Sequence, residues 1–436
     1  MSHLPAPGRA LSRRGVLTGL GALGAASALG LTGCSTSTPG SGSAAAGASE
    51  TDSIKFFGNA LGDNAQKAAW QTIISGWQKK SGKRVEPVVY PYDQAATQLV
   101  LAAKSGSFEG VGQGPWQLLA PSGILADLSD LAARMDLPEE VLDPLRVDGR
   151  LHFLPTTASG IGMVCDGRIA DEAGLEDGMS VEDFATGLER IKRQDPDLIP
   201  YAAVTKNPDL KDAVHWMWGW GSDVVTPDLA CTIGDAASVE AITWYRELQK
   251  AGLTKAGVAR TDARILYARG QAVLYDDAPL AQTFLRSNGG SASLIEATRP
   301  LRRPSAEGRP SVNRFWGNGL FCSAGKGEKT SKSFISYVAT DLGATTALYK
   351  QSALAPADPT VADRIPELRK DVFQTGFRKV IAQHSRGAAW DRLSTAAQID
   401  TAIGEGVAAV LAGQTGVQSG LNALRKKIDD ALQDGS

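Results

Sequence analysis

The sequence lacks the residue patterns of several common classes of protein. It holds only four cysteines and four histidines in 436 residues, and neither a CxxC nor an HExxH spacing occurs. We therefore expect no metal and no other cofactor. A GxSxG motif is also absent, and the one GxGxxG match, Gly19 to Gly24, lies in the N-terminal leader, where it has no structural meaning.

Acidic residues are absent before Glu50, whereas Arg13 and Arg14 precede an apolar, glycine-rich run over residues 16–31. This pattern is typical of an export signal and resembles the twin-arginine type. The run ends in Leu-Thr-Gly-Cys, which resembles a lipobox, so we predict cleavage before Cys34 and a lipid on its sulfur. The alternative is a membrane-spanning helix, but the run is shorter than the ~20 residues that a bilayer requires.

Beyond the signal of residues 1–34, residues 35–52 are mostly Ser, Thr, Gly, Ala and Pro, a composition that predicts a flexible tether. Residues 1–34 contain three arginines, so the remaining chain has 42 basic residues against 47 acidic ones. This net charge of −5 does not suggest nucleic-acid binding. Cys165, Cys231 and Cys322 show no paired spacing and are expected to be buried thiols.

From about residue 53 onward, strand and helix signals alternate, which predicts α/β architecture with a parallel sheet. Strands are expected at 54–57, 84–90, 160–165, 272–275 and 319–323, and helices at 64–81, 97–105, 111–120, 181–193 and 236–250. The C-terminal third is expected to be mostly helical. About 380 globular residues are more than one core holds comfortably, which suggests two domains.

The order of several short motifs resembles family 1 of the bacterial extracellular solute-binding proteins, which includes the maltose-binding protein. The passage Val147-Asp148-Gly149-Arg150-Leu151-His152-Phe153-Leu154-Pro155 is similar to the family's "DGKLYGLP". Further blocks follow in family order at 173–175, 180–184, 241–252, 267–274 and 353–356. The sequence departs from the family at Val164-Cys165-Asp166, where "Tyr-Asn-Lys" is usual, and at Gly110-Val111, where "Asp-Val" is usual.

The resemblance implies a two-lobe periplasmic-binding-protein-like fold of type II, in which each lobe is a mixed sheet flanked by helices. Three crossover hinge segments would fall near Pro155, Trp316 and Pro356. The N-terminal lobe would comprise residues 53–156 and 318–354, and the C-terminal lobe residues 157–317 and 355–436. The resemblance further implies a monomeric, non-enzymatic receptor of an ABC importer, which binds a mono- or oligosaccharide in the inter-lobe cleft and delivers it to the permease transmembrane subunits.

Aromatic rings and planar polar groups are the side chains that sugar recognition requires. Three tryptophans occur within Trp216–Trp220, and at least one of them is expected in the core. Trp316 and Asn318 lie at the implied second crossing, and only one of Asp276 and Asp277 should face a ligand, because they are neighbours on a strand. The predicted ligand-binding residues are Asn59, Gln113, Trp116, Trp216, Trp220, Tyr275, Asp277, Trp316 and Asn318.

Three alternatives stay open at this point. The same fold could bind a glycerophosphodiester or a polyamine, because other branches of it do. A secreted carbohydrate-active hydrolase would need two carboxylates several ångströms apart, which the adjacent Asp276 and Asp277 cannot provide. A structural or adhesive lipoprotein would not explain why aromatic residues concentrate at the predicted loops between the lobes.

Overall fold

Two β-sheets organise the fold. The structure is a computed structural model, and it describes residues 47–58, 61, 64–90 and 94–435. The described residues belong to one compact unit. The predicted Cys34 anchor, the twin-arginine signal and Asn59 lie outside the described residues. None of the helices in the described ranges is long and apolar enough to cross a membrane.

The first sheet has the strand order β2 (Arg84–Val89), β1 (Ser53–Gly58), β3 (Gly110–Gly112), β12 (Gly319–Cys322) and β6 (Leu154–Pro155). β1 is parallel to β2 and β3, whereas β12 is antiparallel to both β3 and β6. The sheet is therefore mixed, and not wholly parallel as the alternation of strands and helices suggested, because β6 and β12 belong to segments that connect the two sheets.

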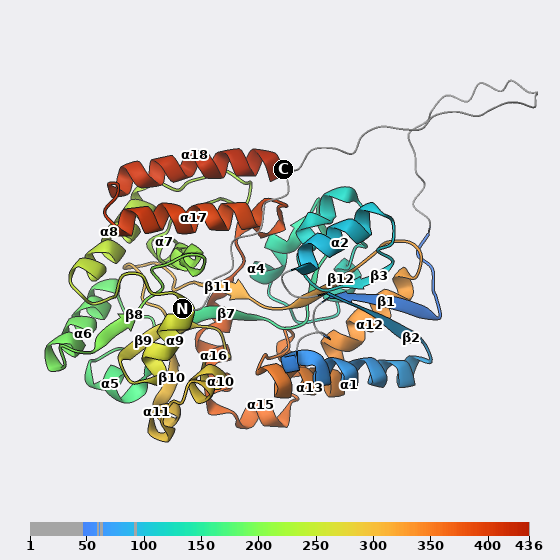
Figure 1. The fold of residues 1–436 in the computed structure, drawn as a ribbon, viewed down its shortest axis with the longest axis horizontal. Helices are drawn as coiled ribbons and strands as arrows, with labels where there is room; N and C mark the ends of the chain where they lie inside the picture. Colours follow the sequence, from blue (N-terminus) through green and yellow to red (C-terminus); the bar gives the residue numbers. More distant parts are fainter. Residues whose placement is uncertain (1–46, 59–60, 62–63, 91–93, 436) are drawn as a thin grey trace, which may run out of the picture. The chain divides into compact units, whose positions relative to one another are not determined.

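Helices cover this first sheet and complete its core: α1 (Asn64–Ser81), α2 (Ala95–Lys104), α12 (Glu328–Thr340) and α13 (Leu342–Ser352). α1 packs on α13, and α12 packs on β3 and β12 (Figure 1). Trp70, Ile73 and Trp77 are spaced three and four residues apart on α1, and all three are buried. We call this sheet with its helices the first lobe.

The second sheet has the order β13 (Ser385–Arg386), β11 (Asn313–Trp316), β7 (Ser159–Asp166), β9 (Ala272–Asp277) and β8 (Ile199–Ala202), and β10 (Thr298–Leu301) also pairs with β7. β7 is antiparallel to β9, β10 and β11, while β8 and β9 are parallel. All eight residues of β7 are buried, which is typical of a central strand covered on both faces.

The helices around this sheet form the second lobe. They include α6 (Val181–Gln194), α7 (Val214–Trp220), α8 (Ala236–Lys250), α9 (Arg260–Ala268), α16 (Val372–Val380), α17 (Ala396–Leu411) and α18 (Val417–Gly435). α17 and α18 pack side by side (Figure 1). α6 begins as the sequence predicted, because the Ser180 side chain accepts a hydrogen bond from the Asp183 amide.

Further short strands and α-helices connect these elements. They are β4 (Arg146–Val147), β5 (Arg150–Leu151), α3 (Ser129–Ala132), α4 (Glu139–Leu142), α5 (Gly167–Glu172), α10 (Ala281–Ser287), α11 (Ala292–Ala297), α14 (Pro359–Ala362) and α15 (Pro366–Lys370). Cys165, Cys231 and Cys322 are buried free thiols, as predicted. Burial raises the pKa of Cys165 to about 12 and that of Cys231 to about 11.

The predicted helix over residues 111–120 is wrong. Gly110–Gly112 is instead a strand, and the 3₁₀ helices Trp116–Leu118 and Ala120–Ser122 follow it. Gly114 has φ 134°, a conformation that L side chains rarely adopt, and Pro115 follows it, so the backbone turns here before any helix can begin.

Candidate functional site

The strand registers bring the ends of both sheets to the places where the chain passes between them. In the first sheet Gly112 lies opposite Phe321, and Gly319 lies opposite Pro155. The end of β3, the end of β6 and the start of β12 therefore share one edge, and Gln113 and Asn318 follow and precede these strand ends.

In the second sheet, Trp316 at the end of β11 lies opposite Ser159 at the start of β7. Asp277 at the end of β9 lies opposite Gly162 of β7. These strand ends also share one edge, because β7 is antiparallel to β9 and to β11. We call these two edges the crossing edges. Gln113 and Asn318 mark the one in the first sheet, and Ser159, Asp277 and Trp316 mark the one in the second. Ligands of open α/β sheets bind outside such strand ends.

Three segments of chain are hydrogen-bonded to one another where they pass between the sheets. The carbonyl of Asn318 accepts hydrogen bonds from the amides of Thr156, at 2.9 Å, and Thr157, at 3.0 Å. The carbonyl of Thr156 accepts one from the amide of Ala357 at 3.1 Å. A Cβ added to Gly317 would lie 2.2 Å from the carbonyl oxygen of Thr157, so only glycine permits this approach. Trp316 and Asn318, both predicted ligand residues, are half-buried here.

Gln113 lies at the crossing edge of the first sheet. Its backbone amide donates to the backbone carbonyl of Phe57 at 2.9 Å, and its side chain packs against Gly58, the last residue of β1. Its side-chain Oε1 is buried and has no hydrogen-bond partner among the described residues. A buried amide oxygen without a partner costs free energy, which a ligand hydroxyl would recover if the side chain turned toward it.

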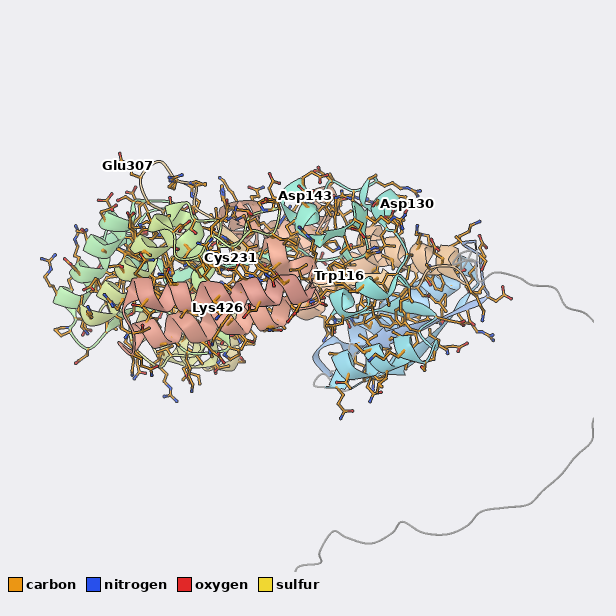
Figure 2. The ribbon with its side chains drawn as sticks, turned by 90° about the horizontal axis from the view of Figure 1, so that it is seen from above. Trp116, Asp130, Asp143, Cys231, Glu307 and Lys426 are labelled. Atoms are coloured by element: carbon orange, nitrogen blue, oxygen red, sulfur yellow. The ribbon has the colours of Figure 1, made fainter. Side chains whose placement is uncertain are left out.

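Trp116 follows the same strand but belongs to the hydrophobic core of the first lobe. It is 4% exposed, and its ring stacks on that of Phe153, with centroids 5.9 Å apart. Trp116 is labelled in Figure 2. This is the packing role that competes with ligand contact for a tryptophan at a turn. Contact with a ligand stays a prediction for Trp116.

The tryptophans of α7 lie mainly in the core of the second lobe. Trp216 is 2% exposed and contacts the rings of Phe184, Tyr201, Trp244 and Tyr245. Trp220, at the end of the helix, is half-buried and packs on Trp244 with centroids 5.0 Å apart. The expected core tryptophan is therefore present, and Trp220 is the more accessible of the two predicted ligand residues.

Tyr275 and Asp277 are both buried at the end of β9, and they lie on the same face of the strand because they are two residues apart. Tyr275 is 1% exposed, and its ring lies 4.7 Å from that of Tyr267. Burial raises the pKa of Tyr275 well above its ordinary value. The Asp277 carboxylate accepts two hydrogen bonds from the Arg264 guanidinium, at 2.7 and 2.8 Å, and one from the Ala278 amide.

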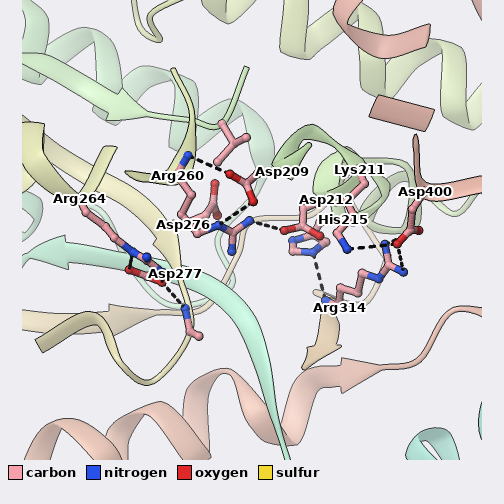
Figure 3. Close-up of polar contacts among 12 residues, drawn as sticks. Asp209, Lys211, Asp212, His215, Arg260, Arg264, Asp276, Asp277, Arg314 and Asp400 are labelled. Atoms are coloured by element: carbon pink, nitrogen blue, oxygen red, sulfur yellow. Dashed lines mark hydrogen bonds and ion pairs between the residues drawn. The ribbon is translucent and has the colours of Figure 1, made fainter. Parts of the chain in front are cut away.

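A network of ion pairs, which the sequence analysis did not predict, surrounds these residues in the second lobe (Figure 3). The Arg314 Nη2 donates to Asp391 Oδ1 and to Asp400 Oδ2, each at 3.0 Å. Asp400 also accepts from the indole nitrogen of Trp390, at 3.0 Å, and from Lys211 Nζ, at 3.2 Å. We call Lys211, Arg314, Asp391 and Asp400 the Arg314 cluster.

In the neighbouring part of the network, each arginine also has a carboxylate partner. Arg260 contacts Asp212 and Asp209, and Arg303 contacts Asp276, which also accepts a hydrogen bond from the Tyr201 hydroxyl. Next to these pairs, the backbone amide of Arg314 donates a hydrogen bond to His215 Nε2 at 3.3 Å. Asp276 and Asp277 therefore engage different arginines, as expected for neighbours on a strand.

Burial and the neighbouring charges together set the protonation of this network. Desolvation, and then the charges of Arg303, Arg314 and Arg260, hold the pKa of His215 well below its ordinary value, so its imidazole is neutral and can accept the Arg314 amide. Desolvation opposes ionisation of Asp400, but Arg314 and Lys211 outweigh it and lower the pKa. Burial raises the pKa of Asp391, and Arg314 opposes that rise.

Several solved structures are similar to this one. The GacH receptor of Streptomyces glaucescens, determined unliganded and in complex with acarbose, matches with a TM-score of 0.70 and 18% identity over 88% of this chain and 99% of that chain. The cyclic α-maltosyl-1,6-maltose-binding protein of Arthrobacter globiformis matches at 0.72 with 16% identity over 88% and 99%. A cyclo/maltodextrin-binding protein complexed with maltotetraose matches at 0.74 with 14% identity over 88% and 98%.

These structures share the α/β fold of two helix-flanked mixed sheets, which confirms the predicted fold class. Among curated proteins no significant match is found. The model of the family described as bacterial extracellular solute-binding protein matches residues 36–374, most of the chain. That family consists of receptors rather than enzymes, which sets the hydrolase alternative aside. The chain therefore belongs to the bacterial extracellular solute-binding proteins.

Proposed function

We propose that the protein is the receptor of an ABC importer and captures a neutral mono- or oligosaccharide between the crossing edges. The observation that carries this proposal is the half-buried Trp316, which precedes Asn318 where the chain crosses between the sheets. An indole face suits the C–H side of a pyranose ring, and an amide suits its hydroxyl groups. Gln113 adds a second amide at the same edge as Asn318.

The charges near the crossing edge of the second sheet favour an uncharged ligand. Each of five basic side chains there has a carboxylate partner within 4.0 Å: Lys211, Arg260, Arg264, Arg303 and Arg314. A phosphate ester would need arginines that are free of such partners, and a polyamine would need free carboxylates. This pairing supports a saccharide over a glycerophosphodiester or a polyamine.

The similar structures support the same ligand class. The GacH receptor was determined in complex with acarbose and the cyclo/maltodextrin-binding protein in complex with maltotetraose, which are properties of those proteins. At a sequence identity of at most 18%, the similarity supports a shared fold only. We infer the ligand class from the aromatic, amide and paired charged groups at the crossing edges.

A ligand between the crossing edges would act by shifting a conformational equilibrium. It would contact both lobes when they close around it, and so would stabilise the closed form by differential affinity. The closed form would then dock on the membrane subunits of the importer. The lipid on Cys34 and the tether of residues 35–52 would keep a monomeric receptor close to those subunits.

A thermal-shift screen of the full chain tests the proposal. Its panel holds mono- and oligosaccharides, glycerophosphodiesters and polyamines, because any ligand that binds only the native state raises the melting temperature. A saccharide that raises it and is recovered chemically unchanged would support the proposal. A shift with phosphate esters or polyamines alone would overturn the ligand class, and consumption of a glycan would overturn the receptor function.

A further inference from the structure

The Arg314 cluster is buried at its centre and accessible at its ends. The side chain of Arg314 is 8% exposed and that of Asp400 is 13% exposed. In contrast, the side chain of Lys211 is 40% exposed and that of Asp391 is 22% exposed. Lys211 and Asp391 are therefore the more accessible cation and anion of the cluster, and Arg314 and Asp400 are the more buried ones.

The cluster lies beside the crossing edge of the second sheet. Arg314 and Trp316 are two residues apart on β11, and Arg314 lies opposite Arg386 of β13, which runs parallel to β11. Asp391 follows the end of β13, in the 3₁₀ helix Ala389–Arg392, and so extends toward the same edge. Lys211, in the 3₁₀ helix Asp209–Ala213 that follows β8, is tied to the cluster by its contact with Asp400.

The four charges of the cluster cancel when both carboxylates are ionised, because two cations face two anions. Resting on the proposed function, we propose that Lys211 and Asp391 contact the bound saccharide, and that the balanced Arg314 cluster makes the site select uncharged rings over amino sugars and sugar acids. Arg314 is a positioning residue in this scheme, since it holds Asp391 and Asp400 without touching the solute.

The selection follows from electrostatics at a partly buried site. A neutral saccharide can donate hydroxyl hydrogen bonds to Asp391 and accept them from Lys211 without disturbing the balance. A charged saccharide loses hydration on binding and finds no net opposite charge to replace it. Removal of one accessible charge would change this, because the ligand would then face a net charge of opposite sign a few ångströms away.

Two substitutions at the accessible ends test the inference with opposite expected signs. Lys211→Met leaves the cluster with a net charge of −1, and Asp391→Asn leaves it with +1. The probes are glucose, glucosamine and glucuronate, which differ chiefly in charge, titrated against the full chain and each variant. We expect Lys211→Met to raise affinity for glucosamine relative to glucose by about tenfold, and Asp391→Asn to raise affinity for glucuronate relative to glucose by about tenfold.

Lys326→Met provides the matched control, because Lys326 pairs with Glu109 at 3.0 Å on the first lobe, away from the Arg314 cluster. Its selectivity should equal that of the unmodified protein. The melting temperature of each variant without ligand shows that it is folded. Selectivity that is unchanged in both cluster variants, or shifted in the same direction by both, would overturn the inference while leaving the proposed function intact. Failure of the unmodified protein to bind any saccharide would instead overturn the proposed function and the inference with it.

Discussion

Asn318 and Thr157 bond to each other twice at the point where the chain crosses between the sheets. The backbone amide of Asn318 donates to the Thr157 hydroxyl at 3.0 Å, and the backbone carbonyl of Asn318 accepts from the backbone amide of Thr157 at 3.0 Å. Two passages of the chain, far apart in sequence, therefore move together. Any hinge motion between the lobes has to bend both at once.

The Thr157 hydroxyl should contribute measurably to stability. Thr157→Val keeps the shape of the side chain but leaves the Asn318 amide without its acceptor, and should lower the free energy of unfolding by about 1–2 kcal/mol. Urea denaturation measures the change. Thr186→Val, on the exposed face of α6, removes a hydroxyl that bonds only its own helix and should change stability by less than about 0.5 kcal/mol. Equal losses in the two variants would contradict the role of Thr157.

Trp316 should contribute more to saccharide affinity than to folding. Trp316→Ala is expected to weaken binding of the best saccharide from the thermal-shift screen by about tenfold or more, because the indole face is lost. Isothermal titration calorimetry gives the dissociation constant. Tyr337→Ala is the control, since Tyr337 is also a half-buried aromatic residue but lies on α12 of the first lobe. An unchanged affinity in Trp316→Ala would show that the sugar stacks elsewhere.

His215 should make the protein less stable in mild acid. Its pKa is held well below its ordinary value in the folded state, so between about pH 6.5, the unfolded value, and the folded pKa only the unfolded chain gains the proton. Stability should therefore fall as pH decreases through this window. His215→Gln retains an acceptor for the Arg314 amide and cannot titrate, so urea denaturation at pH 7.5 and pH 5.5 should show a smaller difference than in the unmodified protein. An equal difference would assign the acid sensitivity to other groups.

Substitution of Gly110 should lower the free energy of unfolding more than substitution of an ordinary turn glycine. Its φ is 143°, and an added Cβ would lie 2.2 Å from the Lys55 carbonyl oxygen of the adjacent strand. Gly110→Ala should therefore cost about 3 kcal/mol or more, from backbone strain and from steric conflict together. Gly106→Ala, with φ 69° and no atom within 4 Å of the added Cβ, should cost about 1 kcal/mol. Thermal unfolding of the two variants makes the comparison.

Local sequence signals predicted the regular elements well. The helices at 181–193 and 236–250 and the strand at 160–165 were found within a residue or two, because their caps and apolar spacing are encoded locally. The helix predicted over residues 111–120 was wrong. Its apolar residues alone suggest a helix, but Gly114 and Pro115 prevent one from forming there. The motif order, rather than any single motif, indicated the family.

The Arg314 cluster could not be predicted in the same way. Arg314 is separated from its partners Asp391 and Asp400 by 77 and 86 residues. The parallel pairing of β11 with β13 brings Arg314 near the segment that carries Asp391, and the packing of α17 on the neighbouring 3₁₀ helices brings Asp400. The burial of Trp216 and Trp116 likewise depends on rings contributed by distant elements. These tryptophans were predicted to bind a ligand from their residue type alone. Tertiary packing, which the sequence does not show, decides which of them a solute can reach.

The most direct test of the account is a crystal structure of the full chain with the saccharide that gives the largest thermal shift. We predict one saccharide bound between the crossing edges, with a ring against Trp316 and hydroxyls within hydrogen-bond distance of the Asn318 or Gln113 side chain. A saccharide bound elsewhere on either lobe, with Trp316 and Asn318 free of contact, would contradict it.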